Sequence, residues 1–465
     1  MNAREDRLRA AAVAVGQEHL FRHLTSLSEA SRARLLDEIE SVDFALVARH
    51  RALVRGEAAG DKQPAFAPAD VFPLARGEAH HARAREAEQR GIEALSRGHV
   101  GYLLVAGGQA SRLGYEGPKG AYRIGPVSDC SLFEIHARRL RAAAARYGRP
   151  APWYVMTSRG NDAQTREFFA EHGYFGLDAR DVMFFSQSMV PALDFEGRIL
   201  MSAEDRLFLA PNGHGGSLEA FARSGALDDA RRRGLRHLSY FQVDNPLAPP
   251  ADPLFLGLHA LEGASMSSKV VEKRDAGEKV GVIGRVDGKL SCIEYTDLPS
   301  ALREARDERG KLRFGAGNIA LHVLDVEFIG ELNRGGLQLP WHLARKSMEV
   351  WEAGQLVKKQ GVKFETFVFD ALEKSERSVT LEVARQREFS PVKNSVGEDS
   401  PATTRADLCR LHAEWVRSAG LPLPEADESG LHPVEVDPLL AEDLETFVAR
   451  GRHRPEVRGR GHLYR

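Results

Sequence analysis

The chain has 465 residues, and its 64 Lys and Arg nearly balance its 66 Asp and Glu, so the net charge is close to zero. This balance gives no molecule-wide field for binding nucleic acid or an acidic membrane surface, and we expect neither as a partner. No stretch approaches the roughly 18 apolar residues of a membrane helix, and no signal-peptide core opens the sequence. With 43% hydrophobic residues, the composition is that of an ordinary globular protein of roughly two to four domains.

Cysteine and histidine usage argues against a metal centre built from these residues. Cys130, Cys292 and Cys409 lie far apart, without a CxxC pair, which suits a reducing compartment and offers no zinc site. The 17 histidines show no HExxH or similar spacing. We therefore predict that the cysteines are packing residues and that the protein is cytoplasmic.

Residues 1–95 are rich in Ala, Arg, Glu and Leu at helical spacing, as in Leu35, Leu36 and Ile39 beside charged neighbours. This pattern predicts an N-terminal region of amphipathic helices whose charges face solvent. Pro64, Pro68 and Pro73 interrupt the pattern, and we expect a loop there before a further helix that leads to residue 95.

Residues 96–398 change to short apolar runs separated by longer amphipathic pieces, a pattern that predicts an α/β sheet covered on both faces. The runs are YLLVA at Tyr102, WYVMT at Trp153, VMFFSQ at Val182, YFQVDN at Tyr240 and SSKVVEK at Ser267. Residues 399–465 form a small C-terminal region, and the basic ending RGRHRPEVRGRGHLYR predicts poorly ordered last residues.

The stretch LLVAGGQASRLGYEGPKGAY, from Leu103 to Tyr122, predicts a buried strand that ends where the backbone approaches an anion. Gly107 and Gly108 can present several backbone N–H groups to one phosphate, while Arg112 and Lys119 add positive charge. The stretch matches neither GxxxxGK[ST] nor GxGxxG. From these residues alone, a phosphate loop and a simple chain turn both remain open.

Polar side chains end several of the predicted strands, which indicates one ligand crevice at the carboxyl edge of the sheet. The strand ends carry Thr157 and Ser158, Gln187, and Asp244 with Asn245. Asp244 has the chemistry of a Mg²⁺ ligand, because Mg²⁺ takes one or two carboxylates together with phosphate oxygens and waters. Capping of the next turn is the alternative for this aspartate.

Five further residues lie in four short stretches towards the C-terminal half. Glu294 in CIEYTDLP and Asn318 in FGAGNIALH suit hydrogen bonding to hydroxyl groups, or stabilise turns. Lys393 in FSPVKNS lies in a loop shaped by a proline. Phe367 and Phe369 in FETFVFD alternate as one face of a strand would, and we expect them to pack in the core.

Together, these segments resemble the UDP-N-acetylglucosamine pyrophosphorylases, within the wider group of UTP:sugar-1-phosphate uridylyltransferases. The resemblance extends from about Gly16 to about Phe447. The motifs that carry it are LLVAGGQASRLGYEGPKGAY, MTS at Met156, FFSQSMVPA at Phe184, PNGHGGSLEA at Pro211, VDNP at Val243, KVVEK at Lys269, VGVIGRVDG at Val280, IEYTDL at Ile293, FGAGNIALH at Phe314, FETFVFD at Phe364 and EFSPVKNS at Glu388. The resemblance implies a Rossmann-like mixed sheet of the GT-A type flanked by helices, and a catalytic domain over 96–398.

The same resemblance implies an enzyme that makes a UDP-sugar and pyrophosphate from UTP and a sugar 1-phosphate. The acceptor would be N-acetylglucosamine 1-phosphate, the cofactor Mg²⁺, and the protein a monomer or weak homodimer. The implied residues are Arg112, Lys119 and Lys393 for the phosphates, Ala106, Gly107, Gly108, Gln187, Gly213 and His214 for the nucleotide, Glu294, Asn318 and Phe369 for the sugar, and Asp244 for the metal.

Two departures from the family pattern concern the sugar more than the reaction. Ala110 and Ser111 stand in GQASRLG where GQGTRLG is common, and His214 stands where the usual GNGG core has an asparagine. An imidazole differs from an amide in size, hydrogen bonding and pH response. Glucose 1-phosphate or N-acetylgalactosamine 1-phosphate therefore stays open as the acceptor, as does a non-catalytic protein that binds nucleotide sugars.

Overall fold

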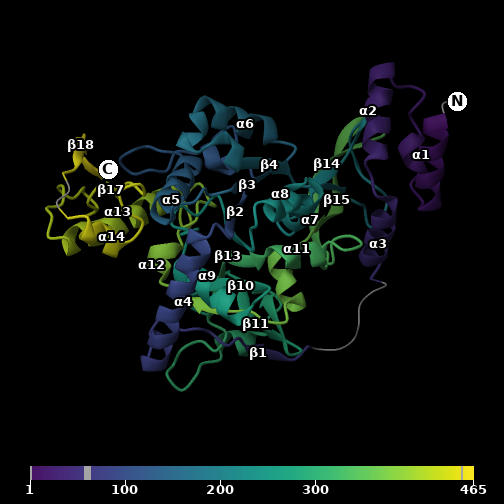
Figure 1. Cartoon of the computed structure of the whole chain (residues 1–465). Helices are drawn as coiled ribbons and strands as arrows, with labels where there is room; N and C mark the ends of the chain where they lie inside the picture. Colours follow the sequence, from purple (N-terminus) through teal and green to yellow (C-terminus); the bar gives the residue numbers. More distant parts are fainter. Residues whose placement is uncertain (1–2, 57–63, 452–453) are drawn as a thin grey trace. The chain divides into compact units, whose positions relative to one another are not determined.

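The computed structural model of the protein describes residues 3–56, 64–451 and 454–465 (Figure 1). The chain divides into two compact units, each built from three segments that are distant in the sequence. Unit 1 takes its described residues from 3–56, Gln187–Ser217 and Leu339–Val368, and unit 2 contains Pro64–Ser186, Leu218–Gln338 and Phe369–Arg465. The predicted regions 1–95, 96–398 and 399–465 are continuous in the sequence and rest on sequence pattern. They therefore describe a different division of the chain from the two compact units, each of which combines separate segments.

Unit 1 combines the N-terminal helices with short strands and one long hairpin. Ser28 and Asp43 cap two of the helices by accepting hydrogen bonds from backbone N–H groups of the first turn. Leu35, Ile39 and Phe364 are among the buried side chains that join the helices to the hairpin. The elements are α1 Ala3–Ala14, η1 Glu18–Phe21, α2 Glu29–Glu40, α3 Phe44–Val54, β5 Met189–Pro191, β6 Met201–Ala203, β7 Arg206–Leu207, β8 Leu209–Pro211, β14 His342–Glu352 and β15 Gln355–Glu365.

Unit 2 contains the large mixed sheet that the apolar runs predict. The five predicted runs are strands β2 Val100–Val105, β3 Trp153–Thr157, β4 Val182–Ser186, β9 His237–Gln242 and β10 Met266–Glu272. The strand order is β1-β11-β13-β9-β2-β3-β4, in which β10 pairs with β13 and β16, and β12 pairs with β11. Strands β9, β2, β3 and β4 are parallel, whereas β13 is antiparallel to β9. The carboxyl ends of four neighbouring strands therefore meet at one edge.

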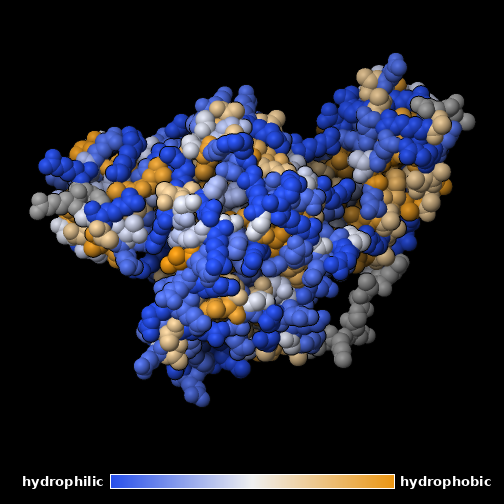
Figure 2. All heavy atoms as spheres, viewed as in Figure 1, coloured by the Kyte–Doolittle hydropathy of each residue, from blue (hydrophilic) through white to orange (hydrophobic). Residues whose placement is uncertain are grey.

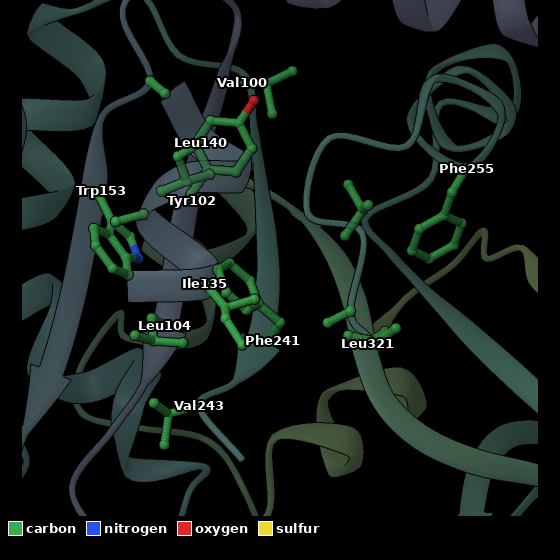
Figure 3. Packing of buried hydrophobic residues seen from close by; sticks show 14 of the residues in the cluster. Val100, Tyr102, Leu104, Ile135, Leu140, Trp153, Phe241, Val243, Phe255 and Leu321 are labelled. Carbon is green, nitrogen blue, oxygen red and sulfur yellow. The ribbon is translucent and has the colours of Figure 1, made fainter. Parts of the chain in front are cut away.

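Helices cover both faces of this sheet (Figure 1). The side chains under the strand ends form one apolar core, in which Tyr102, Trp153 and Phe241 are buried (Figure 3). The remaining strands are β1 Phe66–Pro68, β11 Val282–Val286, β12 Lys289–Ile293, β13 Ala316–Asp325 and β16 Thr380–Glu382. The main helices are α4 Glu78–Ser96, α5 Leu132–Tyr147, α6 Asp162–Glu171, α7 Gly216–Arg223, α8 Ala226–Arg232, α9 Pro253–Glu262, α10 Ser300–Glu304 and α11 Val326–Leu332.

The end of the chain is ordered, so the prediction of a poorly ordered terminus is wrong. Strand β19 (Gly461–Tyr464) pairs with both β17 (Val434–Val436) and β18 (Glu456–Arg458). Leu463 and Tyr464 are buried, and Tyr464 packs in a separate apolar core with side chains such as Trp415 and Phe447. Glu435 accepts hydrogen bonds from the backbone of Val127 and Ser128. Apolar side chains inside a basic stretch thus fix this end. Helices α12 Arg385–Glu388, α13 Pro401–Ser418 and α14 Leu444–Ala449 complete the region.

Several smaller expectations can be compared with the structure. The N-terminal helices and the helix that leads to residue 95 are confirmed, with the short strand β1 between them. The three cysteines are free and buried, as packing residues should be. Phe367 and Phe369 do not share a strand face, because β15 ends at Glu365 and the 3-10 helix η6 (Val368–Lys374) follows.

The visible surface is mainly hydrophilic (Figure 2). Hydrophilic residues dominate the face shown in Figure 2, and apolar residues appear there in small separate groups. Within the described residues, no helix is both long enough and apolar enough to cross a membrane.

Candidate active site

The glycine loop after β2 is held by backbone contacts on its inner side and is bare on the other. Ala106 N donates to Met156 O at 2.8 Å, and Asn161 Nδ2 donates to the carbonyls of Ala106 at 2.8 Å and Gly108 at 3.2 Å. A Cβ added to Gly108 would meet no atom within 4 Å. The loop therefore presents open backbone, as a phosphate-binding loop must.

The same loop carries two cationic residues in fixed positions. Arg112 lies exposed in the 3-10 helix η2 (Ser111–Leu113), and it has no ion-pair partner in the described part of the chain. Lys119 N donates to Gly108 O at 3.0 Å, which closes the loop into a short hairpin. Both charges therefore extend from a loop whose base is fixed.

Lys119 and Asp244 are in direct contact, and the pairing of β2 with β9 brings the segments that carry them to the same edge of the sheet. Strand β2 lies parallel to β9, and Val243 N donates to Val105 O at 3.1 Å just beyond the last strand residues. Lys119 Nζ lies 3.2 Å from Asp244 Oδ2, and the Asp244 residue is only 7% exposed. Two motifs that are 125 residues apart in sequence thus form one ion pair.

Lys393 is brought to the same place from the C-terminal side. Val392 N donates to Asp244 O at 2.9 Å, while Lys393 N and Asn394 N both donate to Asp399 O. The Lys393 ammonium lies 5.4 Å from the centre of the Phe389 ring, and the residue is exposed. Lys119, Asp244 and Lys393 therefore belong to one cluster.

Asp399 is a member of this cluster that the sequence analysis missed. Burial raises the pKa of its carboxyl, the Lys393 and Arg274 charges act in the opposite direction, and the Asp244 charge raises it further. Its backbone has a φ of 54°, in the left-handed region, and its carbonyl closes the loop that begins at Lys393. No local motif indicates this role.

A second set of residues, for which the sequence analysis predicted no supporting role, holds the Lys393 segment against the Asp244 segment. Asn245 Nδ2 donates to Glu388 O at 2.7 Å, and Ser390 N donates to Asn245 Oδ1 at 3.1 Å. Lys269, only 1% exposed, lies 2.5 Å from Asp252 and 2.6 Å from Glu388. Burial acts to lower the pKa of Lys269, but the two carboxylates outweigh it and raise the pKa. The KVVEK motif, which begins at Lys269, was the one feature of the sequence that could have indicated a role for this lysine.

Two predicted sugar residues gather around one edge of the sheet. Asn318 N donates to Gly281 O at 2.8 Å, and a Cβ added to Gly281 would lie 3.4 Å from Glu294 Oε1. Asn318 Nδ2 lies 3.6 Å from Cys292 Sγ, and burial together with the Glu294 charge raises the pKa of that thiol. Phe369 lies buried in η6. The structure therefore brings Glu294 and Asn318 together.

Three predicted nucleotide residues belong to unit 1. Gln187 directly follows β4 and is buried, and Gly213 has a φ of 81°. His214 Nδ1 accepts a hydrogen bond from Val368 N at 3.2 Å, and its ring stacks on Phe367 at 5.2 Å. Burial lowers the pKa of His214 to about 4, with a smaller contribution from the His342 charge, so the imidazole is neutral near pH 7.

Comparison with known proteins assigns the chain to a family. The model of the UTP–glucose-1-phosphate uridylyltransferase family matches residues 61–414. UDP-N-acetylhexosamine pyrophosphorylase-like protein 1 of Homo sapiens is 36% identical, with 96% of this chain and 95% of that protein covered. UDP-N-acetylglucosamine pyrophosphorylase of Saccharomyces cerevisiae is 34% identical, with 88% and 90% covered. The chain therefore belongs to the UTP–glucose-1-phosphate uridylyltransferase family, and the predicted family of nucleotidyl-transferring enzymes is confirmed.

Solved structures agree with this assignment. The uridine diphosphate N-acetylglucosamine pyrophosphorylase of Trypanosoma brucei superposes with a TM-score of 0.83 at 28% identity, covering 97% of this chain and 95% of that chain. A UDP-glucose pyrophosphorylase mutant of Leishmania major gives a TM-score of 0.63 at 16% identity, covering 91% and 87%. The second likeness concerns the fold alone. The predicted mixed α/β sheet flanked by helices is confirmed.

Proposed function

We propose that this enzyme transfers the uridylyl group of UTP to N-acetylglucosamine 1-phosphate and releases pyrophosphate. The observation that carries the proposal is the contact of Lys119 with Asp244 beside the bare loop at Gly108. A lysine, an acidic metal ligand and open backbone N–H groups at one sheet edge are the groups that a nucleoside triphosphate requires. The names of the yeast and Trypanosoma brucei relatives support the choice of sugar.

The charges of the cluster suit a reaction between two polyanions. An oxygen of the sugar phosphate attacks the α-phosphorus of UTP, and the bond to the bridging oxygen breaks in line as pyrophosphate leaves. Because the sugar phosphate is already ionised near neutral pH, no general base is needed. We propose that Lys119, Arg112 and Lys393 hold the phosphates and stabilise the developing charge, without a covalent intermediate.

Asp244 fits Mg²⁺ bound partly through the substrate. Its buried carboxylate is the type of oxygen ligand that Mg²⁺ prefers, and Mg²⁺ commonly takes one or two carboxylates with phosphate oxygens and waters. No group of three or more His, Cys, Asp or Glu suited to a metal occurs among the described residues. We propose Asp244 as the protein ligand. The ion would supply positive charge to the phosphate oxygens as pyrophosphate leaves.

The remaining roles are proposed from the family motifs and from local geometry. Backbone N–H groups of the glycine loop would contact the nucleotide, and polar side chains near Gly281 would contact the sugar. We assign Ala106, Gly107, Gly108, Gln187, Gly213 and His214 to the nucleotide, and Glu294, Asn318 and Phe369 to the sugar.

His214 favours a second candidate, the same reaction with another sugar. Since its Nδ1 accepts the Val368 N–H, the neutral ring carries its hydrogen on Nε2. A single N–H donor then stands where an asparagine would offer both a donor and an acceptor. Glucose 1-phosphate and N-acetylgalactosamine 1-phosphate are the alternative acceptors.

Pyrophosphate release with a panel of sugar 1-phosphates tests the proposal directly. We expect release from UTP with N-acetylglucosamine 1-phosphate, and loss of release when EDTA removes the divalent cation. A clear preference for glucose 1-phosphate would move the specificity to the second candidate. No release with any sugar, together with measurable binding of a UDP-sugar, would identify a non-catalytic binding protein.

We also propose that the enzyme acts in the cytoplasm as a monomer or weak homodimer. Three free, buried cysteines support a reducing compartment. Light scattering across a concentration series measures the mass of the assembly, and a stable tetramer would overturn this part of the proposal.

A further inference from the structure

Lys273, the last residue of the KVVEK motif, is a mostly buried lysine whose ammonium group has no ion-pair partner among the described residues. It follows β10, where its backbone N–H donates to Gly315 O at 2.9 Å. The residue is 7% exposed, and over residues 3–56, 64–451 and 454–465 its side chain makes no hydrogen bond or ion pair. The Lys273 Nζ is not among the fully buried unpaired nitrogens of the described residues, so an anion that arrives from solvent can reach and pair with this ammonium.

The charge of a second cation, Arg303, acts on Lys273. Burial lowers the pKa of Lys273, nearby Glu278 and Asp275 oppose that effect, and the Arg303 charge lowers it further. Arg303, in α10, donates to Tyr295 O at 3.5 Å and pairs with no carboxylate within the described residues. Two like charges near each other favour an anion between them.

The two acidic neighbours of Lys273 are already engaged elsewhere. Glu278 forms an ion pair with Arg385 at 2.8 Å and accepts from Arg274 N at 2.8 Å. Asp275 Oδ1 accepts from Gly277 N at 2.7 Å. Both negative charges act on Lys273 from nearby, but neither carboxylate forms an ion pair with it within the described residues.

The two cations lie beside the residues proposed to contact the sugar. A Cβ added to Gly317 would be 3.5 Å from Lys273 Cγ, and Gly317 directly precedes Asn318. Tyr295, whose carbonyl Arg303 contacts, directly follows Glu294. Lys273 and Arg303 thus each contact a neighbour in sequence of one residue of the Glu294–Asn318 cluster.

We propose that Lys273 and Arg303 form a subsite for the phosphate group of the sugar 1-phosphate. This inference rests on the proposed function, because it names a binding site for the acceptor of that reaction. A phosphate dianion matches two cationic donors, and such charge-assisted hydrogen bonds are stronger than neutral ones. The subsite is separate from Lys119 and Lys393, which we assign to UTP and to the leaving pyrophosphate.

Lys273→Met and Arg303→Met test the subsite by steady-state kinetics at saturating UTP. Methionine keeps the length of the apolar stem and removes the charge. For each variant we expect the KM for N-acetylglucosamine 1-phosphate to rise roughly 10- to 100-fold, the loss of one charged hydrogen bond. The KM for UTP should change little. Lys273→Arg should recover most of the affinity.

Lys289→Met is the matched control, because Lys289 is an exposed lysine in the β11–β12 hairpin of the same sheet. It should keep both KM values. If Lys273 has a purely structural role, Lys273→Met should lower the melting temperature and should lower kcat/KM for UTP and for the sugar phosphate alike. That pattern would overturn the inference.

Equilibrium binding separates failure of the inference from failure of the proposed function. Titrations use N-acetylglucosamine 1-phosphate, inorganic phosphate and free N-acetylglucosamine with the full-length protein. If the wild type turns over and both Met variants keep their KM for the sugar phosphate, only the inference fails. If no sugar 1-phosphate is turned over, the proposed function fails. In that case the titration with inorganic phosphate tests the anion subsite. If the wild type binds phosphate and Lys273→Met binds it more weakly, the subsite is supported. If the wild type does not bind phosphate, or the variant binds it equally well, the subsite is overturned.

Discussion

Two glycine-rich segments of this protein look alike in sequence but differ in what their bare backbone faces. In the loop after β2, a Cβ on Gly108 would meet nothing within 4 Å, and Lys119 and Asp244 lie beside the loop. In PNGHGG, a Cβ on Gly213 would lie 2.4 Å from Thr366 O, and one on Gly215 would lie 2.7 Å from Phe367 N. The first backbone is open to a ligand, whereas the second is packed against the end of β15.

The comparison shows that a glycine cluster has two distinct physical causes. One is the need to present N–H groups to an anion, and the other is close contact between two stretches of backbone. Only the first is direct support for a phosphate site. Substitutions in the loop after β2 should therefore lower activity with little loss of stability, whereas substitutions of the packed glycines of PNGHGG should lower stability as well as any contribution to nucleotide binding.

Lys119→Met, in the loop after β2, should give the largest effect, and the quantity that changes should be the turnover number. Removing one electrostatic stabiliser of the transition state lowers kcat by roughly 100- to 1000-fold. Because Lys119 is only partly buried, we expect the melting temperature to change little. Steady-state pyrophosphate release and a thermal melt measure the two quantities.

Lys311→Met provides the control for this prediction, since Lys311 forms only an exposed ion pair with Glu272. Its kinetics should match the wild type. Nearly normal turnover in Lys119→Met would mean that the contact with Asp244 has no part in the reaction.

Gly213→Ala should give the next largest effect, on the stability side. The φ of 81° is unfavourable for alanine, and the new methyl group would collide with Thr366 O. We expect a loss of about 2–4 kcal/mol in the free energy of unfolding. Urea denaturation measures it. Gly225 has a similar φ of 85°, but a Cβ added there would meet no described atom within 4 Å. Gly225→Ala should therefore lose less free energy of unfolding, and the difference between the two variants measures the cost of the collision.

His214→Asn should change how stability depends on pH. The pKa of His214 is about 4, against an ordinary value of 6.5. As the pH falls below 6.5, the unfolded chain binds a proton that the folded protein does not, so the free energy of unfolding falls until the pH passes about 4. The asparagine variant should lose roughly 3 kcal/mol less over this window. Equal losses in both proteins would show that His214 titrates normally when folded.

The sheet was predictable because its strands are short, buried and apolar, and because parallel strands bring their carboxyl ends to one edge. That rule places Asp244 near the loop that carries Lys119, and the structure confirms the contact. The alternation of Phe367 and Phe369 failed as a strand signal, since two residues are too few to show that a strand continues past Glu365.

The supporting contacts could not be predicted, because they join residues with no shared local pattern. Asn161 reaches back to the carbonyl of Ala106, and Lys269 meets Glu388 across 119 residues of sequence. Each partner alone is compatible with an ordinary cap or a solvated charge. Only the tertiary fold shows that these side chains hold the loops of the site in place.

Gly108→Ala should give the smallest change in stability and is the sharpest test of the comparison. The φ of Gly108 is outside the left-handed region and its Cβ would meet no protein atom, so the free energy of unfolding should change by less than about 0.5 kcal/mol. A methyl group facing a bound nucleotide would nonetheless raise the KM for UTP. Steady-state kinetics and urea denaturation on the same preparation separate the two effects. A variant with unchanged KM would show that the open side of the loop does not face UTP, and the loop would then be only a turn.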